Sequence, residues 1–200
     1  IKQRLLAVAS SIAILMSALP MTAFATDAAV SGTGTEENPY VYEVRDAADL
    51  SDAVAAINAD TSDSAHYTIS LQKDITCSGL SFSRNTTTIL GNNHKLTFEH
   101  YDGAIQVGSG TTTHPVLILG GAQGTLTIEG APSYETYFIG VGAISGGTEY
   151  GTLKMCDGVT ITDAKGNNYF GGAVIVAGGG QFEMNGGTIK DCGIDGGSVC

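Results

Sequence analysis

The chain has 200 residues, of which 28 are glycine and 14% are charged, and its formal net charge is −11 at pH 7. This acidic balance excludes general nucleic-acid binding, because that binding needs a basic face to neutralise phosphates. The length suffices for one domain.

The first 25 residues have the pattern of a secretory signal peptide. Lys2 and Arg4 precede an apolar stretch, residues 5–19, and the small residues Ala23 and Ala25 flank Phe24 at a cleavage site. The apolar stretch is shorter than the ~20 residues of a membrane span, which disfavours a transmembrane anchor. We expect cleavage after Ala25, and a secreted or cell-surface protein whose mature part has no membrane span. Without Lys2 and Arg4, the remaining basic residues and the 20 acidic ones give a net charge of −13.

Residues 26–39 read as a linker, and residues 40–66 as an N-terminal cap made of a strand and a helix. The strand is expected at residues 40–44, where apolar and polar side chains alternate. Asp46 is a plausible N-cap, and apolar residues recur at helical spacing after it, which predicts a helix over 47–59. Because the end of a repeat stack exposes its core, we expect this helix to cover that end. The alternative is a helix from a separate small domain.

Residues 142–200 contain two copies of one unit and the beginning of a third. Residues 153–155 match 182–184, residues 160–163 match 188–191, and residues 171–174 match 196–199, at spacings of 25–29 residues. A period of this size is typical of repeat architectures. Because the chain begins with Ile1 and ends at Cys200 within a repeat, we expect a fragment truncated at its C-terminus.

Each unit contains short alternating runs separated by Gly or Asn clusters, which indicates strands joined by tight corners. Three short strands per turn fit an all-β solenoid over residues 67–200, namely a right-handed parallel β-helix with an N-terminal capping α-helix. The same spacing, traced upstream, predicts two rows of inward side chains. They are Phe98, Ile128, Met155 and Met184, and Ile89, Leu117, Ile144 and Val174.

Two segments carry a resemblance to known families. The run from Thr88 through Leu96, T-I-L-G-N-N-H-K-L, follows I-S-L-Q-K-D-I and resembles the entrance of pectin-lyase-like right-handed β-helix proteins. The glycine-rich unit around F-E-M-N-G-G-T-I-K-D is similar to repeats in large adhesin-like surface proteins of Gram-positive gut bacteria. The resemblance covers residues 40–200. It implies an exported β-helix but does not decide activity, since such folds include lyases, hydrolases and non-catalytic stalks.

The first functional expectation is a non-catalytic stalk or adhesin-like protein that presents a face to host or matrix glycans or proteins. The alternative is a polysaccharide lyase or glycoside hydrolase with its site beyond this fragment. Lyases that the chain resembles pair an acidic Ca²⁺ site with a catalytic Arg or Lys. The sequence has no arginine after Arg84 and only Lys154, Lys165 and Lys190 after Lys95, and the resemblance carries over no catalytic basic residue to these positions.

The candidate ligand contacts are Tyr134, Tyr137 and Tyr169, because aromatic rings on a solenoid face can stack on sugar rings. The alternative is that their loops pack back on the coil. Asp163 and Asp191 occupy equivalent positions 28 residues apart and are the candidate metal ligands, with Ca²⁺ as the ion. The alternative assigns both aspartates to turns. We expect no other cofactor.

The four cysteines permit disulfides in an exported protein, but their spacing suggests no disulfide framework. Cys156 and Cys192 are interpreted as small buried or half-buried residues.

Overall fold

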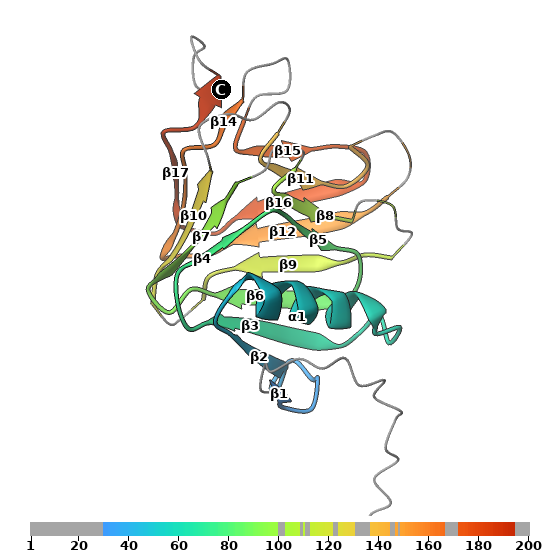
Figure 1. Cartoon of the computed structure of the whole chain (residues 1–200). Coiled ribbons are helices and arrows are strands. Elements are labelled where there is room, and N and C mark those ends of the chain that lie inside the picture. Colours follow the sequence, from blue (N-terminus) through green and yellow to red (C-terminus); the bar gives the residue numbers. More distant parts are fainter. Residues whose placement is uncertain are drawn as a thin grey trace, which may run out of the picture.

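The computed structural model describes residues 30–99, 103–108, 110, 113–121, 124–130, 137–144, 147, 149–166 and 172–194. Within these residues the protein is mostly β, with one helix and extensive parallel sheets (Figure 1). No helix in this part of the chain is long and apolar enough to span a membrane. The predicted signal peptide, residues 1–25, lies outside the described residues.

Three sheets contain most of the strands. The first sheet consists, in spatial order, of β1 (Val30–Ser31), β2 (Tyr40–Val44), β3 (His66–Leu71), β6 (Thr86–Leu90), β9 (Val116–Leu119), β12 (Gly151–Met155) and β16 (Gly180–Met184). The second consists of β17 (Thr188–Lys190), β13 (Val159–Thr162), β10 (Leu126–Gly130), β7 (His94–Phe98) and β4 (Ile75–Cys77). The third consists of β15 (Val174–Val176), β11 (Ile139–Val141), β8 (Ile105–Val107) and β5 (Leu80–Phe82). A further pair joins β14 (Lys165–Gly166) and β18 (Gly193–Ile194).

The chain visits the three sheets in turn. Strands β3, β4 and β5 belong to the first, second and third sheets, and β6, β7 and β8 follow in the same order. One passage of the chain through the three sheets is called a round. Each strand of the later round pairs in parallel with its counterpart from the earlier round. Among the described strand pairs, only β1 and β2 run antiparallel. Strands from successive rounds therefore lie side by side.

Inward side chains align across neighbouring strands. In the second sheet, Ile75, Leu96, Ile128 and Ile161 are register partners in succession, and each is at most 3% exposed. The outward positions between them are mostly polar, because side chains of a strand alternate between its two faces. Full burial of one such aliphatic side chain stabilises the fold by about 1.5–3 kcal/mol. These aligned rows make up the core.

Helix α1 spans Ala47–Ala59, the range predicted from the sequence. Oδ1 of Asp46 accepts hydrogen bonds of 2.9 Å from the backbone N–H groups of Ala48 and Asp49, which confirms the predicted N-cap. The buried face of α1 contacts β2, β3, β4 and β5, the N-terminal strands of the three sheets (Figure 1). Its buried residues are Leu50, Ala53, Val54 and Ile57.

The tandem matches are confirmed as register partners. Leu153 and Met155 pair with Phe182 and Met184, and Ile161 pairs with Ile189. The third match, residues 171–174 with 196–199, falls largely outside the described residues.

Apart from the step from Met155 to Met184, the two rows were wrong. Phe98 and Ile128 lie on the second sheet, whereas Met155 lies on the first, where its neighbour is Leu119. Ile89 also pairs with Leu119, not with Leu117. One round contains inward side chains on three strands, so several apolar residues satisfy the same spacing and spacing alone does not select the right one.

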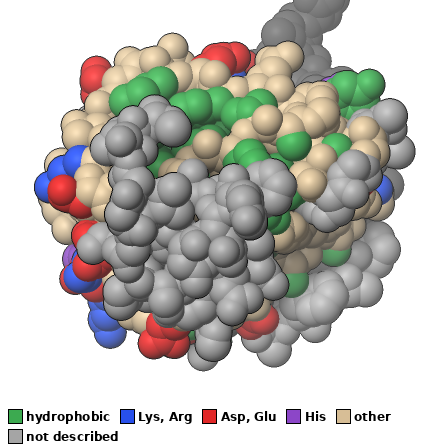
Figure 2. All heavy atoms as spheres, turned by 90° about the horizontal axis from the view of Figure 1, so that it is seen from above, with side chains coloured by type: hydrophobic (Ala, Val, Ile, Leu, Met, Phe, Trp, Pro, Cys, Tyr) green, Lys and Arg blue, Asp and Glu red, His purple; other side chains and the backbone are tan. Residues whose placement is uncertain are grey.

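The end of the sheets formed by β15, β16 and β17 exposes apolar side chains. Val176 is 46% exposed and Met184 is 49% exposed, although their partners one strand earlier, Val141 and Met155, are fully buried. Figure 2 looks onto this end and shows hydrophobic side chains at the surface. Burial of an inward side chain therefore requires cover on both sides of its strand, from a second strand or, for the edge strands β4 and β5, from α1.

Candidate functional site

Tyr137 is the one predicted ligand contact that the described residues contain, and it lies against the third sheet. A β-carbon built on Gly140 would lie 2.6 Å from Cε2 of the tyrosine ring, and one built on Gly103 would lie 2.7 Å from the same atom. Nε2 of Gln106 donates a hydrogen bond of 3.1 Å to the tyrosine hydroxyl. The glycines make room for the ring, and the hydrogen bond helps to hold it in position.

The other two predicted aromatic contacts, Tyr134 and Tyr169, lie outside the described residues. The predicted aromatic patch is therefore represented by Tyr137 alone, which is half-buried against the sheet. Tyr137 packs partly against the sheet, which agrees in part with the alternative that the loops of these tyrosines pack back on the strands. Its placement leaves part of the side chain accessible.

Asp163 and Asp191 stand at equivalent positions, as the repeat predicts. Strands β13 and β17 are in register up to Thr162 and Lys190, and each aspartate is the next residue. Both aspartates have left-handed backbone conformations, with φ of 56° and 52°. The Thr162 hydroxyl donates a hydrogen bond of 3.0 Å to Oδ2 of Asp163. Asp tolerates the left-handed region better than most residues, so both positions suit a turn.

No group of three or more His, Cys, Asp and Glu side chains within the described residues is arranged to hold a metal ion. Asp163 and Asp191 therefore lack a third ligand of these types in the part of the chain that the structure describes. Ca²⁺ binding by this pair stays a prediction, and the turn accounts for both residues locally.

A second aromatic feature is a contact that the sequence did not predict, although Tyr150 itself is one of several tyrosines expected near loops. The rings of His114 and Tyr150 stack with centroids 4.4 Å apart and an interplanar angle of 11°. They are neighbours because β9 and β12 pair Val116 with Thr152, which aligns the residues two positions earlier. These two residues are 36 apart in sequence, longer than the repeat spacing, so the period did not predict their contact. Tyr150 is 41% exposed.

A buried amide joins the end of α1 to the corner before β6. Asn85 is 4% exposed and has a left-handed φ of 61°. Its Nδ2 donates hydrogen bonds to the backbone carbonyls of Ile57 and Asp60, at 3.1 and 3.0 Å. Its Oδ1 accepts from the Ala65 N–H and the Ser62 hydroxyl, at 3.2 and 3.3 Å. The four hydrogen bonds of this side chain therefore hold the end of α1 against the corner before β6.

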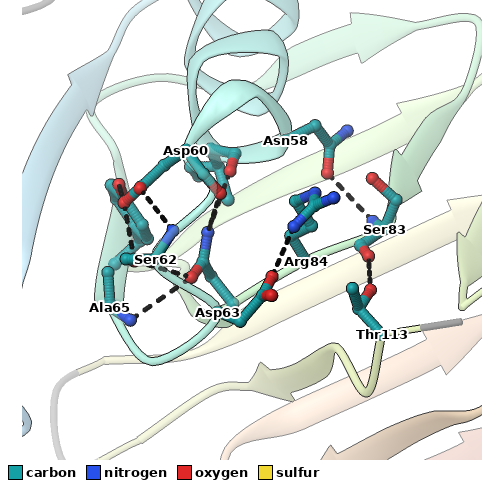
Figure 3. Close-up of polar contacts among 11 residues, drawn as sticks. Asn58, Asp60, Ser62, Asp63, Ala65, Ser83, Arg84 and Thr113 are labelled. Atoms are coloured by element: carbon teal, nitrogen blue, oxygen red, sulfur yellow. Dashed lines mark hydrogen bonds and ion pairs between the residues drawn. The ribbon is translucent and has the colours of Figure 1, made fainter. Parts of the chain in front are cut away.

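Asp60, Ser62, Asp63 and Arg84 form further polar contacts at this corner (Figure 3). The Tyr67 hydroxyl donates a 2.6 Å hydrogen bond to Asp60, and Arg84 forms an ion pair with Asp63. Burial by itself raises the pKa of Asp60, but the hydrogen bonds from Tyr67 and Ser62 and the Arg84 charge bring that pKa below its ordinary value. Burial, and then the contact with Asp60, raise the pKa of Tyr67. Because these groups bond to each other, the cluster has a structural role.

The described cysteines are unpaired thiols. Cys77 is buried, whereas Cys156 and Cys192 are half-buried, as predicted for the latter two. Burial, together with the Glu99 charge, raises the pKa of Cys77 to about 12. Burial also raises the pKa of Cys192, with smaller upward contributions from Asp163 and Asp191. Neither of these two thiols is activated as a nucleophile.

Comparison with known proteins found no matching protein-family model, no similar curated protein and no similar solved structure.

Proposed function

We propose that this chain is a secreted or cell-surface right-handed parallel β-helix that has no catalytic role and presents a side face for binding glycans or proteins. The observation that carries the proposal is the register of the three parallel sheets. Strands from successive rounds pair residue against residue, as in Leu153 with Phe182 and Ile161 with Ile189. A regular stack of this kind is rigid and offers extended surfaces for recognition.

The outward charges support a binding role over a catalytic one. Lys95 forms an ion pair of 2.8 Å with Glu129, and Lys154 forms one of 3.1 Å with Glu183. Each pair joins neighbouring strands of one sheet, so the groups neutralise each other across the surface. A catalytic site would instead bring titratable groups together in a cleft with shifted pKa values.

The signal-peptide pattern supports export. Lys2, Arg4, the apolar residues 5–19 and the site ending at Ala25 together predict secretion with cleavage. The resemblance to adhesin-like repeats points to display at a cell surface, with host or matrix glycans or proteins as the partner class.

The aligned positions of Asp163 and Asp191 favour a second candidate, a polysaccharide-degrading enzyme. Two carboxylates on neighbouring strands could act as an acid–base pair or bind Ca²⁺. This candidate predicts that replacement of both aspartates by asparagine abolishes glycan cleavage or Ca²⁺ binding. A small change in stability alone would assign both residues to turns.

The test is to secrete the chain from a bacterial host and to measure its binding and its chemistry in parallel. We expect the N-terminus of the secreted protein to follow Ala25. We also expect retention on immobilised glycans or matrix proteins, and no shortening of soluble polysaccharides. Release of oligosaccharides would replace the binding function by the enzymatic one. Failure to bind either class of surface would contradict the proposal.

A further inference from the structure

The outward-facing side chains of the third sheet are uncharged at every strand. The register aligns one outward position from β5, β8, β11 and β15. The residues at these positions are Ser81, Gln106, Gly140 and Ile175. No acidic or basic side chain stands among them, whereas each of the other two sheets has charged residues at some of its outward positions.

The outward rows of the first and second sheets contain ions. Lys154 and Glu183 face outward from the first sheet, and Lys95 and Glu129 face outward from the second. A ligand that covers these positions would have to displace or accommodate an ion pair. A ligand on the aligned row of the third sheet would not have to break an ion pair. The groups of that row are a hydroxyl, an amide, a glycine without a side chain and an aliphatic side chain.

The Tyr137 ring lies on this uncharged face. Gly140 belongs to the outward row itself, and its missing side chain leaves the space that the ring occupies. Gly103 has a left-handed φ of 69° and is close to the same ring. The apolar side chain of Ile144 lies near the same place, since its Cγ1 would be 3.1 Å from a β-carbon on Gly140. The result is an aromatic ring beside an aliphatic group, with the amide of Gln106 at the tyrosine hydroxyl.

We propose that the outer face of the third sheet, centred on Tyr137 and Gln106, binds an uncharged hexose-containing glycan. This inference rests on the proposed function and names its site and ligand class. The apolar C–H face of a pyranose packs on the accessible part of the Tyr137 ring and on Ile144. Sugar hydroxyls bond to neighbouring polar groups, the combination of aromatic surface and few polar groups that ligand sites use. The net charge of −11 disfavours glycans that contain carboxylates or sulfates.

The experiment measures binding of the whole secreted chain to an array with two glycan classes. One class consists of neutral oligomers of glucose, galactose and mannose, and the other of galacturonate oligomers and sulfated glycans. We expect binding to neutral oligomers. Tyr137→Ala should weaken this binding about tenfold or more, since it removes the ring. Tyr137→Phe should stay within about threefold of the unmodified chain, because it keeps the ring and loses only the hydroxyl.

Two further variants separate the site from general effects on the fold. Gly140→Ala keeps Tyr137 but places a methyl group where the ring lies, so binding should weaken while the unfolding transition stays cooperative. Tyr150→Ala is the matched control, because it removes an exposed tyrosine whose ring stacks on His114 and is not among the atoms next to Gly103 or Gly140. Its binding should be unchanged.

The possible binding results distinguish failure of the proposed site, of the ligand class and of the proposed function. Neutral-glycan binding that survives Tyr137→Ala and Gly140→Ala would overturn the site and leave the proposed function standing. Binding to the acidic class alone would overturn the ligand class. Binding to matrix proteins with no glycan retained would overturn this inference, whereas no retention on proteins or glycans would overturn the proposed function as well.

Discussion

Met155 and Met184 are register partners on β12 and β16, yet the first is fully buried and the second is 49% exposed. The two residues have the same side chain at the same position of the repeat. They differ because β12 has neighbouring strands on both sides, β9 and β16, whereas β16 is the outermost strand of the first sheet among the described residues. Burial of an inward side chain in this protein thus depends on what covers the two sides of its strand.

This pair gives a matched test of the core. Met155→Ala should reduce the free energy of unfolding by about 2–5 kcal/mol, because it leaves a cavity between flanking strands. Met184→Ala should change it by less than about 1 kcal/mol, since the side chain is already half in solvent. Urea denaturation followed by circular dichroism measures both. Equal losses in the two variants would contradict the arrangement.

Asn85 should be the most sensitive polar residue near α1. Asn85→Ala removes its four hydrogen bonds and places alanine in the left-handed region, so we expect a loss of about 2–4 kcal/mol. Asn85→Gly removes the same hydrogen bonds but tolerates a φ of 61°. The glycine variant should therefore be more stable than the alanine variant. If both variants unfold like the parent chain, the amide does not fasten the helix.

The contact between Asp60 and Tyr67 predicts sensitivity to acid. The pKa of Asp60 is lowered in the folded state, so its carboxylate adds stability at pH above its unfolded pKa of about 4. That contribution is lost as the pH falls through the lowered folded pKa. Tyr67→Phe removes the hydrogen bond, and its melting temperature should lie below that of the parent chain at pH 6. At pH 2–3 the gap should narrow, and a gap independent of pH would refute the assignment.

Cys77 should resist alkylation in the folded protein. The thiol is buried, and its pKa is raised to about 12 by burial and by the Glu99 charge, so almost no thiolate exists at pH 8. Iodoacetamide at pH 8 should modify Cys156, which is half-buried, before Cys77. Peptide mapping by mass spectrometry gives the order. Modification of Cys77 should appear only when urea unfolds the chain, and early modification in buffer would show that the core opens locally.

Sequence patterns correctly predicted the helix and the pairing of the repeated segments. The N-cap at Asp46 and the spacing of Leu50, Val54 and Ile57 located α1, because these signals act within a few residues. The repeated segments around Ile161 and Ile189 predicted their pairing, because nearly identical segments take the same place in successive rounds. Farther upstream the copies diverge, and Ile89 was aligned with Leu117 although its partner is Leu119.

The candidate site was predictable only in part. Tyr137 was selected because it lies near a loop, and that criterion also selected Tyr134 and Tyr169, which lie outside the described residues. The repeat spacing did not predict the stack of His114 on Tyr150, because the segments between strands differ in length. The αL conformations of Asp163 and Asp191 were consistent with the turn interpretation, which the sequence had left open beside Ca²⁺ binding.

The sequence by itself determined the alternation of strands, the helix over 47–59 and the repeat near the C-terminus, because each depends on residues close in the chain or on copies of one segment. Tertiary structure alone decided which strands are neighbours upstream of that repeat and which inward side chains are shielded on both sides. It also decided the setting of Tyr137, whose ring needs the empty space at Gly103 and Gly140 and the amide of Gln106. Gly103 and Gln106 come from the preceding round, more than 30 residues earlier, and only the parallel pairing of β8 with β11 brings that round beside the ring.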